Sequence, residues 1–431
     1  MNGKVSTTFG SLSEVVRAGL KSTVARNAAS LYLIQFANYM VPLVMVPYLV
    51  RVLGPASYGA VAFAQGLVNY LMVFVEYGFD WSATRKISVH RENLEAVNQT
   101  ALPVWAAKVL LALAGFVLLL ALMVLVPKIR DVKWLLLALY GIVLGNALFP
   151  TWLFQGMERM VAISVINLGT KLSILVGVFL LVKRPDDAVL YASLLGGGSL
   201  VAGLTGAVVA FWMFGLRPRR VYPGEVWEVL KEGWVLFLSK ASVSLYTVGN
   251  AFILGMLTNH TVVGYYTAAE KIVRGLLGLL GPISQATYPR FSKLAAESRE
   301  RALIWGRRML LFMGSIGSLI SAAVYLFASL ISSLILGLQY ERSIAVIRIL
   351  SPIILLIAMN NTLGVQILFP FRQERLVTGV VFAAGLINIV VALLLVPSLA
   401  EKGMAISVLI AEIFVTISYY LAVQTKVAKR V

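Results

Sequence analysis

The feature that most constrains this chain is a series of apolar stretches, each long enough to form a helix that crosses a bilayer. Such a helix uses about 20 apolar residues, and about twelve stretches of that length can be placed along the sequence. They cover residues 29–50, 60–79, 101–126, 134–154, 160–182, 188–214, 232–256, 264–288, 309–330, 344–369, 376–396 and 403–424. Because a helix satisfies its own backbone polar groups in lipid, this pattern predicts an all-α polytopic membrane protein.

The composition supports a membrane protein and excludes several kinds of site. Hydrophobic residues make up 59% of the 431 residues and charged residues 13%, against about 45–50% and about 25% in soluble domains. The absence of cysteine rules out disulfides, iron–sulfur clusters and thiolate zinc sites. The only histidines, His90 and His260, are far apart in sequence, so we expect no metal site. The net charge of +18 is spread between apolar stretches, which predicts contact with anionic membrane lipids and no nucleic-acid partner.

The basic residues also predict the orientation. With the N-terminus inside, the cytoplasmic connections hold 23 of the 37 lysines and arginines and the opposite connections hold 8. This asymmetry favours a cytoplasmic position for both termini. We therefore expect a cytoplasmic N-terminal segment (1–28), an N-lobe of six spans (29–214), a cytoplasmic inter-lobe loop (215–231), a C-lobe of six spans (232–424) and a cytoplasmic tail (425–431). Within the first segment, residues 11–27 fit either a surface helix or a flexible tail.

Weak internal similarity relates the two halves. Residues 58–65 resemble residues 263–270, an offset of 205 that aligns Gly59 with Gly264. Glu158-Arg159 and Glu374-Arg375 follow the fourth and tenth stretches at an offset of 216. Duplicated bundles that face one another are common in transporters. The similarity therefore predicts about 12 transmembrane helices in two pseudo-symmetric six-helix lobes around a central cavity.

Six basic residues lie inside the predicted spans and are the candidates for substrate binding. A charge at the bilayer centre costs about 2.5–3.5 kcal/mol, so these side chains should face polar surroundings. One interpretation is a water-filled cavity that binds an anionic solute such as a diphosphate; the other is a set of structural ion pairs, for which Glu270 and Arg274, four residues apart, are an example. The six candidates are Lys108, Lys171, Lys240, Lys271, Arg274 and Arg348.

Three acidic residues, Glu76, Glu270 and Glu412, also lie inside the spans. They are the candidates for carrying a coupling proton or sodium ion, and no other cofactor is expected. The sequence lacks a phosphate-binding Walker motif, a nucleophile elbow and a metal-ligand pair at helical spacing. Most of the predicted outer connections are short. We therefore predict a transporter without catalytic residues.

Four sequence blocks resemble a known family. They are residues 47–59 (Pro-Tyr-Leu-Val-Arg-Val-Leu-Gly-Pro-Ala-Ser-Tyr-Gly), 77–85, 155–159 and 263–272. Together they are similar to the Wzx-type polysaccharide (O-antigen) repeat-unit flippases of the multidrug/oligosaccharidyl-lipid/polysaccharide exporter superfamily. The resemblance implies a cation-lined lumen that moves undecaprenyl-diphosphate-linked oligosaccharides from the cytoplasmic to the periplasmic leaflet of the bacterial inner membrane by alternating access. It also makes a polysaccharide polymerase and a chain-length regulator candidate partners.

Three alternatives to a flippase of this type predict other sequence features. An ion-coupled multidrug exporter predicts a lumen dominated by acidic residues, whereas the spans here contain six basic and three acidic residues. The lipid II flippases typically have fourteen spans, which makes them a poorer match. A membrane glycosyltransferase or polymerase predicts a long outer loop with clustered acids, which this sequence lacks. The sequence does not identify the glycan.

Overall fold

A computed structural model describes residues 23–247 and 249–428, which form helices and no strand. Residues 1–22 and 429–431 lie outside this description, and with them most of the predicted N-terminal segment and part of the predicted tail. The first half contains α2 (Thr23–Glu76), α3 (Phe79–His90), α4 (Leu94–Leu125), α5 (Pro127–Arg130), α6 (Lys133–Leu148), α7 (Thr151–Gly156), α8 (Met160–Leu181), η1 (Pro185–Asp187) and α9 (Ala188–Phe214).

The second half continues with shorter helical pieces. It contains α10 (Pro223–Thr247), α11 (Asn250–Leu257), α12 (His260–Leu277), η2 (Gly278–Leu280), α13 (Gly281–Glu297), α14 (Arg299–Leu326), α15 (Ala328–Ile331), η3 (Ser332–Leu336), η4 (Leu338–Tyr340), α16 (Ser343–Leu350), α17 (Pro352–Asn360), η5 (Asn361–Leu368), α18 (Glu374–Ala422) and η6 (Val423–Ala428).

Helices cover every predicted span. In the part of the chain that the structure describes, eight candidate spans are long and apolar enough to cross a membrane. Two of these candidate spans, Val44–His90 and Glu374–Val427, each include parts of two predicted stretches. The chain turns sharply between the two stretches, at Gly54 (φ +71°) in α2 and at Ala400 (φ +49°) in α18. The all-α polytopic fold is thus confirmed, and the count of twelve crossings stays a prediction.

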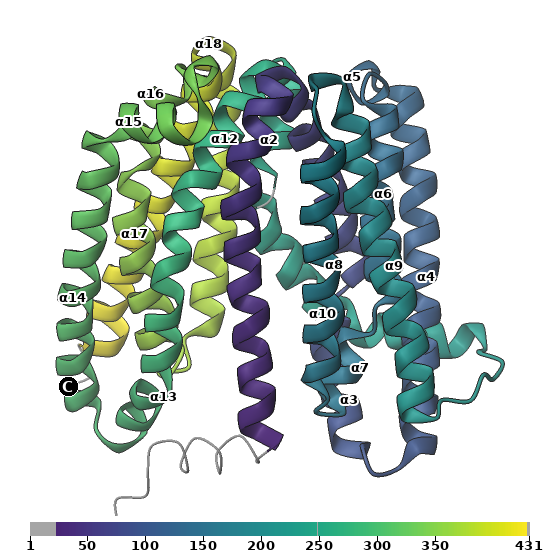
Figure 1. The fold of residues 1–431 in the computed structure, drawn as a ribbon. Helices are drawn as coiled ribbons and strands as arrows, with labels where there is room; N and C mark the ends of the chain where they lie inside the picture. Colours follow the sequence, from purple (N-terminus) through teal and green to yellow (C-terminus); the bar gives the residue numbers. More distant parts are fainter. Residues whose placement is uncertain (1–22, 248, 429–431) are drawn as a thin grey trace, which may run out of the picture.

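The helices form two groups on either side of the first half of α2 (Figure 1). One group contains α4, α6, α8 and α9, and the other contains α14, α17 and α18. We call the end of the molecule that carries α3, α7 and α13 the proximal end, and the end that carries α5 and α16 the distal end. The described chain begins at the proximal end, and the described parts of the connections predicted to be cytoplasmic gather there.

Local sequence explains where several helices begin and how closely they pack. The side chain of Asn93 accepts a hydrogen bond from the backbone N–H of Ala96 (3.1 Å) at the start of α4, which satisfies a helix-end donor. Small residues let α6 and α9 touch through their backbones: a Cβ placed on Gly141 would lie 2.6 Å from the carbonyl oxygen of Gly196. Close packing of this kind is typical of membrane helices.

The internal duplication is visible in the backbone. Glu158 and Arg372 both have φ of +56°, an uncommon value for residues other than glycine. The next residue in each case donates its N–H to a carbonyl five positions earlier, at 2.8 Å in the first half and 3.0 Å in the second. These matching turns align the two lobes at an offset of 214, which corrects the offset of 216 expected from the sequence.

Candidate functional site

The two lobes meet along a seam between the second half of α2 and α12. A Cβ placed on Gly59 would lie 1.8 Å from the carbonyl oxygen of His260, and one placed on Gly264 would lie 2.0 Å from that of Pro55. Each glycine therefore faces the backbone of the residue four positions before the other. Because the same offset of 205 relates both pairs, the seam is self-complementary, as in a contact across a two-fold axis.

Further contacts join the lobes at the distal end. The side-chain amide of Gln339 donates to the carbonyl oxygens of Val50 (3.1 Å) and Arg51 (3.2 Å), and the guanidinium of Arg51 donates to the carbonyl of Leu334. These bonds link α2 to the segment around η3 and η4. The distal end is thus closed by direct contacts between chain segments almost 290 residues apart.

A lysine in the connection after α4 closes a second part of the distal end. The ammonium group of Lys128 donates to the carbonyl oxygens of Gly255 (3.4 Å), Met256 (2.8 Å) and Thr258 (2.9 Å). These carbonyls lie at the C-terminus of α11, where a cation is favoured by the helix dipole and by acceptors without helical partners. Lys128 therefore ties α5 of the N-lobe to α11.

Lys271 lies at the same seam. Its ammonium group is 5.2 Å from the centroid of the Tyr58 ring, and Tyr58 is buried on α2, next to Gly59. The cation on α12 thus contacts an aromatic residue of the opposite lobe. Sequence analysis did not identify Tyr58 as a partner, although it belongs to the block at residues 47–59.

Lys240 and Lys108 belong to a polar cluster of the N-lobe. Lys240, on α10, forms an ion pair with Glu76 and another with Asp80 (3.5 Å). The side chain of Asn146 donates to Glu76 (3.2 Å), and the buried ammonium group of Lys108 donates to the backbone carbonyl of Asn146 (2.8 Å). Lys240 thus follows the alternative interpretation of structural ion pairs, whereas Lys108 donates to a backbone carbonyl. Sequence analysis missed Asp80, which lies in the first turn of α3, just after the break that follows Glu76 at the end of α2.

Lys171 lines a pocket in the N-lobe, which we call the N-lobe pocket. Its volume is about 360 Å³. Amide and hydroxyl side chains surround the lysine, and the rest of the lining is apolar. The helical residues come from α2, α6, α7, α8 and α9. The polar ones besides Lys171 are Asn146, Thr151, Asn167, Thr170 and Ser199.

A second pocket, the C-lobe pocket, has a volume of about 260 Å³. It contains Arg274 and Glu270, which form an ion pair at 2.9 Å, as the alternative interpretation expects. It also contains Glu412 on α18, whose carboxylate accepts a hydrogen bond from the side chain of Asn360 (2.8 Å). Glu270 and Glu412, two of the three candidates for ion coupling, therefore line one pocket.

The six basic candidates are thus not gathered in one place. Arg348 is exposed on α16, and its guanidinium donates to the hydroxyl of Ser329 (3.3 Å). Lys271 lies at the seam, Lys171 in the N-lobe pocket and Arg274 in the C-lobe pocket. Their role in substrate binding stays a prediction.

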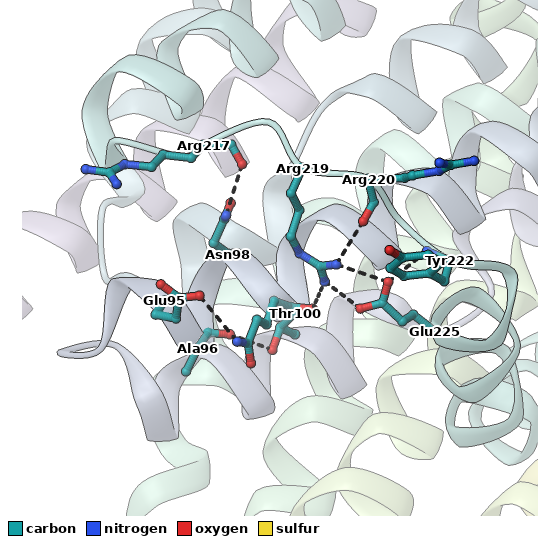
Figure 2. A network of polar contacts seen from close by, with 10 residues as sticks. Glu95, Ala96, Asn98, Thr100, Arg217, Arg219, Arg220, Tyr222 and Glu225 are labelled. Atoms are coloured by element: carbon teal, nitrogen blue, oxygen red, sulfur yellow. Dashed lines mark hydrogen bonds and ion pairs between the residues drawn. The ribbon is translucent and has the colours of Figure 1, made fainter.

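The connection between α9 and α10 is fixed at the proximal end by a polar network (Figure 2). Arg219 forms a two-bond ion pair with Glu225 (2.6 and 3.0 Å), and the side chain of Asn98 donates to the carbonyl of Arg217 (3.0 Å). Hydrogen bonds from Arg219 and from the backbone N–H of Tyr222 lower the pKa of the Glu225 carboxyl. The side chains of Arg217 and Arg220 point away from the network. The inter-lobe connection is therefore docked onto the start of α4.

Comparisons with known proteins agree with this architecture. The chain is 30% identical to a protein of Escherichia coli (strain K12) named "Putative O-antigen transporter". The match covers 92% of this chain and 95% of that protein. A protein of the same name from Shigella dysenteriae is 28% identical over 93% of this chain and all of that protein. The prediction of a transporter rather than an enzyme is confirmed by these relatives.

Solved structures show the same fold at low sequence identity. The lipid II flippase MurJ in an inward closed conformation matches with a TM-score of 0.72 and 14% identity, over 93% of this chain and 87% of that one. An inward-facing multidrug resistance MATE transporter of the MOP superfamily matches with a TM-score of 0.70 and 14% identity. This match covers 92% of the present chain and 98% of the transporter. A family model described as polysaccharide biosynthesis protein matches residues 24–295. The chain therefore belongs to the polysaccharide biosynthesis protein family, within a two-lobed transporter fold.

Proposed function

We propose that this protein is a flippase that moves undecaprenyl-diphosphate-linked oligosaccharide repeat units from the cytoplasmic to the periplasmic leaflet of the bacterial inner membrane. Membership of the family and the names of the relatives support a role in O-antigen or other surface polysaccharide export. The observation that carries the proposal is the seam, where two similar lobes meet through backbone contacts at Gly59 and Gly264 and present Lys271 beside them.

The way in which the two lobes touch supports alternating access. Hydrogen bonds to backbone carbonyls and contacts between glycines hold the distal end closed, and such contacts can break and form again without unfolding either lobe. In the proposed cycle, the distal end opens after the substrate has entered from the proximal side. Lys271 meets the diphosphate between the lobes, because an ammonium group can compensate a phosphate charge without fixed geometry.

In the proposed orientation, the proximal end faces the cytoplasm. The basic connections predicted to be cytoplasmic gather at this end, as the positive-inside rule requires. The substrate therefore enters from the leaflet in which lipid-linked sugars face the cytoplasm. A polysaccharide polymerase and a chain-length regulator are the candidate partners on the periplasmic side.

A coupling proton or sodium ion fits the C-lobe pocket best. Glu412 is buried, lines this pocket together with Glu270, and is held by Asn360. A carboxylate can bind Na⁺ together with an amide oxygen, or it can take up a proton itself. Glu76 is a weaker candidate because it is paired with Lys240. Glu412 is therefore the first residue to test for coupling.

Replacing Glu412 with Gln should lower the rate of glycan export about tenfold or more, because the amide keeps the shape but neither titrates nor carries a charge. The measurement is surface glycan in a flippase-deficient strain that expresses the variant at wild-type level. The Glu374→Gln variant, which changes an acidic residue outside the C-lobe pocket, is the control. Wild-type export by Glu412→Gln, with an unchanged response to proton and sodium gradients, would exclude Glu412 from coupling.

Complementation tests the function itself. The gene should restore surface glycan in a flippase-deficient strain that makes a suitable repeat unit, and cells without it should accumulate the lipid-linked repeat unit on the inner leaflet. Double replacement of Lys240 and Lys271 with Ala should reduce export at equal protein level, because it removes the ion pair on α10 and the cation at the seam. If strains with and without the gene distribute the lipid-linked intermediate equally between leaflets, the protein is not its flippase.

The C-lobe pocket supports one alternative, an ion-coupled exporter of cationic drugs. Glu270 and Glu412 would provide negative charge for a cationic compound. Deletion would then lower resistance to cationic drugs and leave surface glycan unchanged. The opposite pattern is the result expected from the flippase.

A further inference from the structure

Two sets of hydrogen bonds close the distal end at equivalent places in the two lobes. We call the bonds that Lys128 donates to the opposite lobe the lysine clasp, and those that Gln339 donates the glutamine clasp. Each donor bonds to the backbone carbonyls of two successive residues. The acceptors of the two clasps lie 205 positions apart, the offset that relates the seam glycines; they are Gly255 and Met256 for the lysine, and Val50 and Arg51 for the glutamine.

The two clasps differ in charge. The side chain of Gln339 is neutral, whereas Lys128 carries a positive charge against the carbonyls at the C-terminus of α11. Next to the lysine clasp, His260 begins α12, two residues after Thr258, whose carbonyl also accepts a bond from the lysine. At the offset of 205, the position of His260 is taken by Pro55 in the other lobe. The duplicated closure has therefore gained a titratable residue on one side.

The His260 side chain is half-buried at the seam. Its Nδ1 atom is buried and has no hydrogen-bond partner among the described residues. Phe63 of the opposite lobe lies against it, with 5.4 Å between the ring centroids, and the backbone carbonyl of His260 faces Gly59. A protonated imidazole has two N–H donors and a positive charge, which are costly to bury without a partner. The closed distal end therefore favours the neutral ring.

The charged groups that act on this ring come from the connection after α4. Burial lowers the pKa of His260; the carboxylate of Asp131, just after α5, opposes this shift, and the ammonium group of Lys128 adds to it. The other neighbouring elements are uncharged here, because α2 faces the ring with Phe63 and α11 contains no charged residue. Protonation of His260 would thus place a second positive charge near Lys128 and weaken the lysine clasp.

We propose that His260 is a proton-binding site that opens the distal end of the protein. When the lobes separate there, the ring leaves Phe63 and reaches water, and its pKa returns toward the usual value of about 6.5. The closed state then binds the proton less tightly than the open state. By linkage, a fall in pH through this range favours opening, and a rise in pH favours closure.

This inference rests on the proposed function for the periplasmic position of the distal end. The proton that reaches His260 then comes from the periplasm. Glu270 and Glu412, the candidates for ion coupling, line the C-lobe pocket, and His260 is not among the residues of that pocket. A proton on His260 therefore acts on the closure of the distal end and is separate from a coupling ion in the C-lobe pocket.

Opening of the distal end can be measured without substrate. Because the chain has no cysteine, a Trp134→Cys/Leu338→Cys protein carries nitroxide labels at these two positions alone, which are exposed at the starts of α6 and η4. Double electron–electron resonance in lipid nanodiscs then gives the distribution of distances between the lobes. We expect the population of the longer distance to rise about threefold or more between about pH 8 and about pH 5.5.

The chain has two histidines, and they provide matched variants. His260→Gln keeps a neutral polar side chain that does not titrate, so it should abolish the rise. His90→Gln, which changes the exposed histidine of α3 at the proximal end, should keep it. Asp131→Asn removes the carboxylate that favours the protonated ring and should move the rise to lower pH. Asp186→Asn, at an exposed carboxylate of η1, is its control.

Size-exclusion profiles in detergent identify misfolded variants. A pH response that persists in well-folded His260→Gln, or that is absent from the wild type, would overturn the proposal. If His260→Gln misfolds, the Asp131→Asn profile decides, and an unshifted profile rejects the site. Because no glycan is used, a protein that fails complementation and keeps the pH response disproves the flippase alone. A working flippase without the response disproves the proton site alone.

Discussion

Cross-linking Arg51→Cys to Gln339→Cys is expected to abolish glycan export. In the structure, the amide of Gln339 lies 3.2 Å from the carbonyl oxygen of Arg51, and both side chains are exposed at the distal end. A short bifunctional methanethiosulfonate reagent should bridge the two thiols and keep the distal end closed. Because the proposed cycle requires this end to open, the locked protein should retain less than about a tenth of its export.

The design has internal controls. The sequence contains no other cysteine, so each single-cysteine variant treated with the same reagent reports the effect of modification without a bridge. A reducing agent should break the bridge and restore export. Export at the untreated rate by a protein whose cross-link is verified by mass spectrometry would show that the distal end need not open.

The Gly59→Ala variant is expected to have the second largest effect. Its new Cβ would lie 1.8 Å from the carbonyl oxygen of His260, a distance that backbone atoms cannot tolerate. The seam must then separate, and overpacking of this kind costs about 1–3 kcal/mol or more. We expect a lower melting temperature in detergent and a loss of most glycan export.

A reciprocal variant and a matched control make the prediction specific. Gly264→Ala should have the same effect, because its Cβ would lie 2.0 Å from the carbonyl oxygen of Pro55. Gly197→Ala changes a glycine of α9 around which the structure leaves open space, and it should behave as the wild type. Normal stability and export in both seam variants would mean that the lobes do not meet through these glycines.

Part of the candidate site could be predicted from sequence because it depends on local pattern. The similarity of residues 58–65 to residues 263–270 aligned Gly59 with Gly264, and these glycines face each other's chain at the seam. The spacing of Glu270 and Arg274 likewise anticipated their ion pair. Repeats and helical spacings are properties of the chain itself, so they are readable without a structure.

The positions of the other charges depended on contacts between distant segments. Lys240 pairs with Glu76, 164 positions earlier in the chain, and the buried Lys108 bonds to a backbone carbonyl on α6. The sequence predicted only that these cations avoid lipid. Whether a cation faces a cavity or a carboxylate depends on how the helices are rotated and packed, which no local pattern specifies.

The sequence by itself determined the membrane-spanning helices, the duplication and the predicted orientation, because span length, repeat spacing and the placement of basic residues act locally through the bilayer. Only the tertiary structure placed Lys171 and Lys271 in different sites and revealed one pocket in each lobe, lined by different charged residues. The physical reason is that a pocket is formed by side chains from several helices, and its charge is set by which of them face inward after packing.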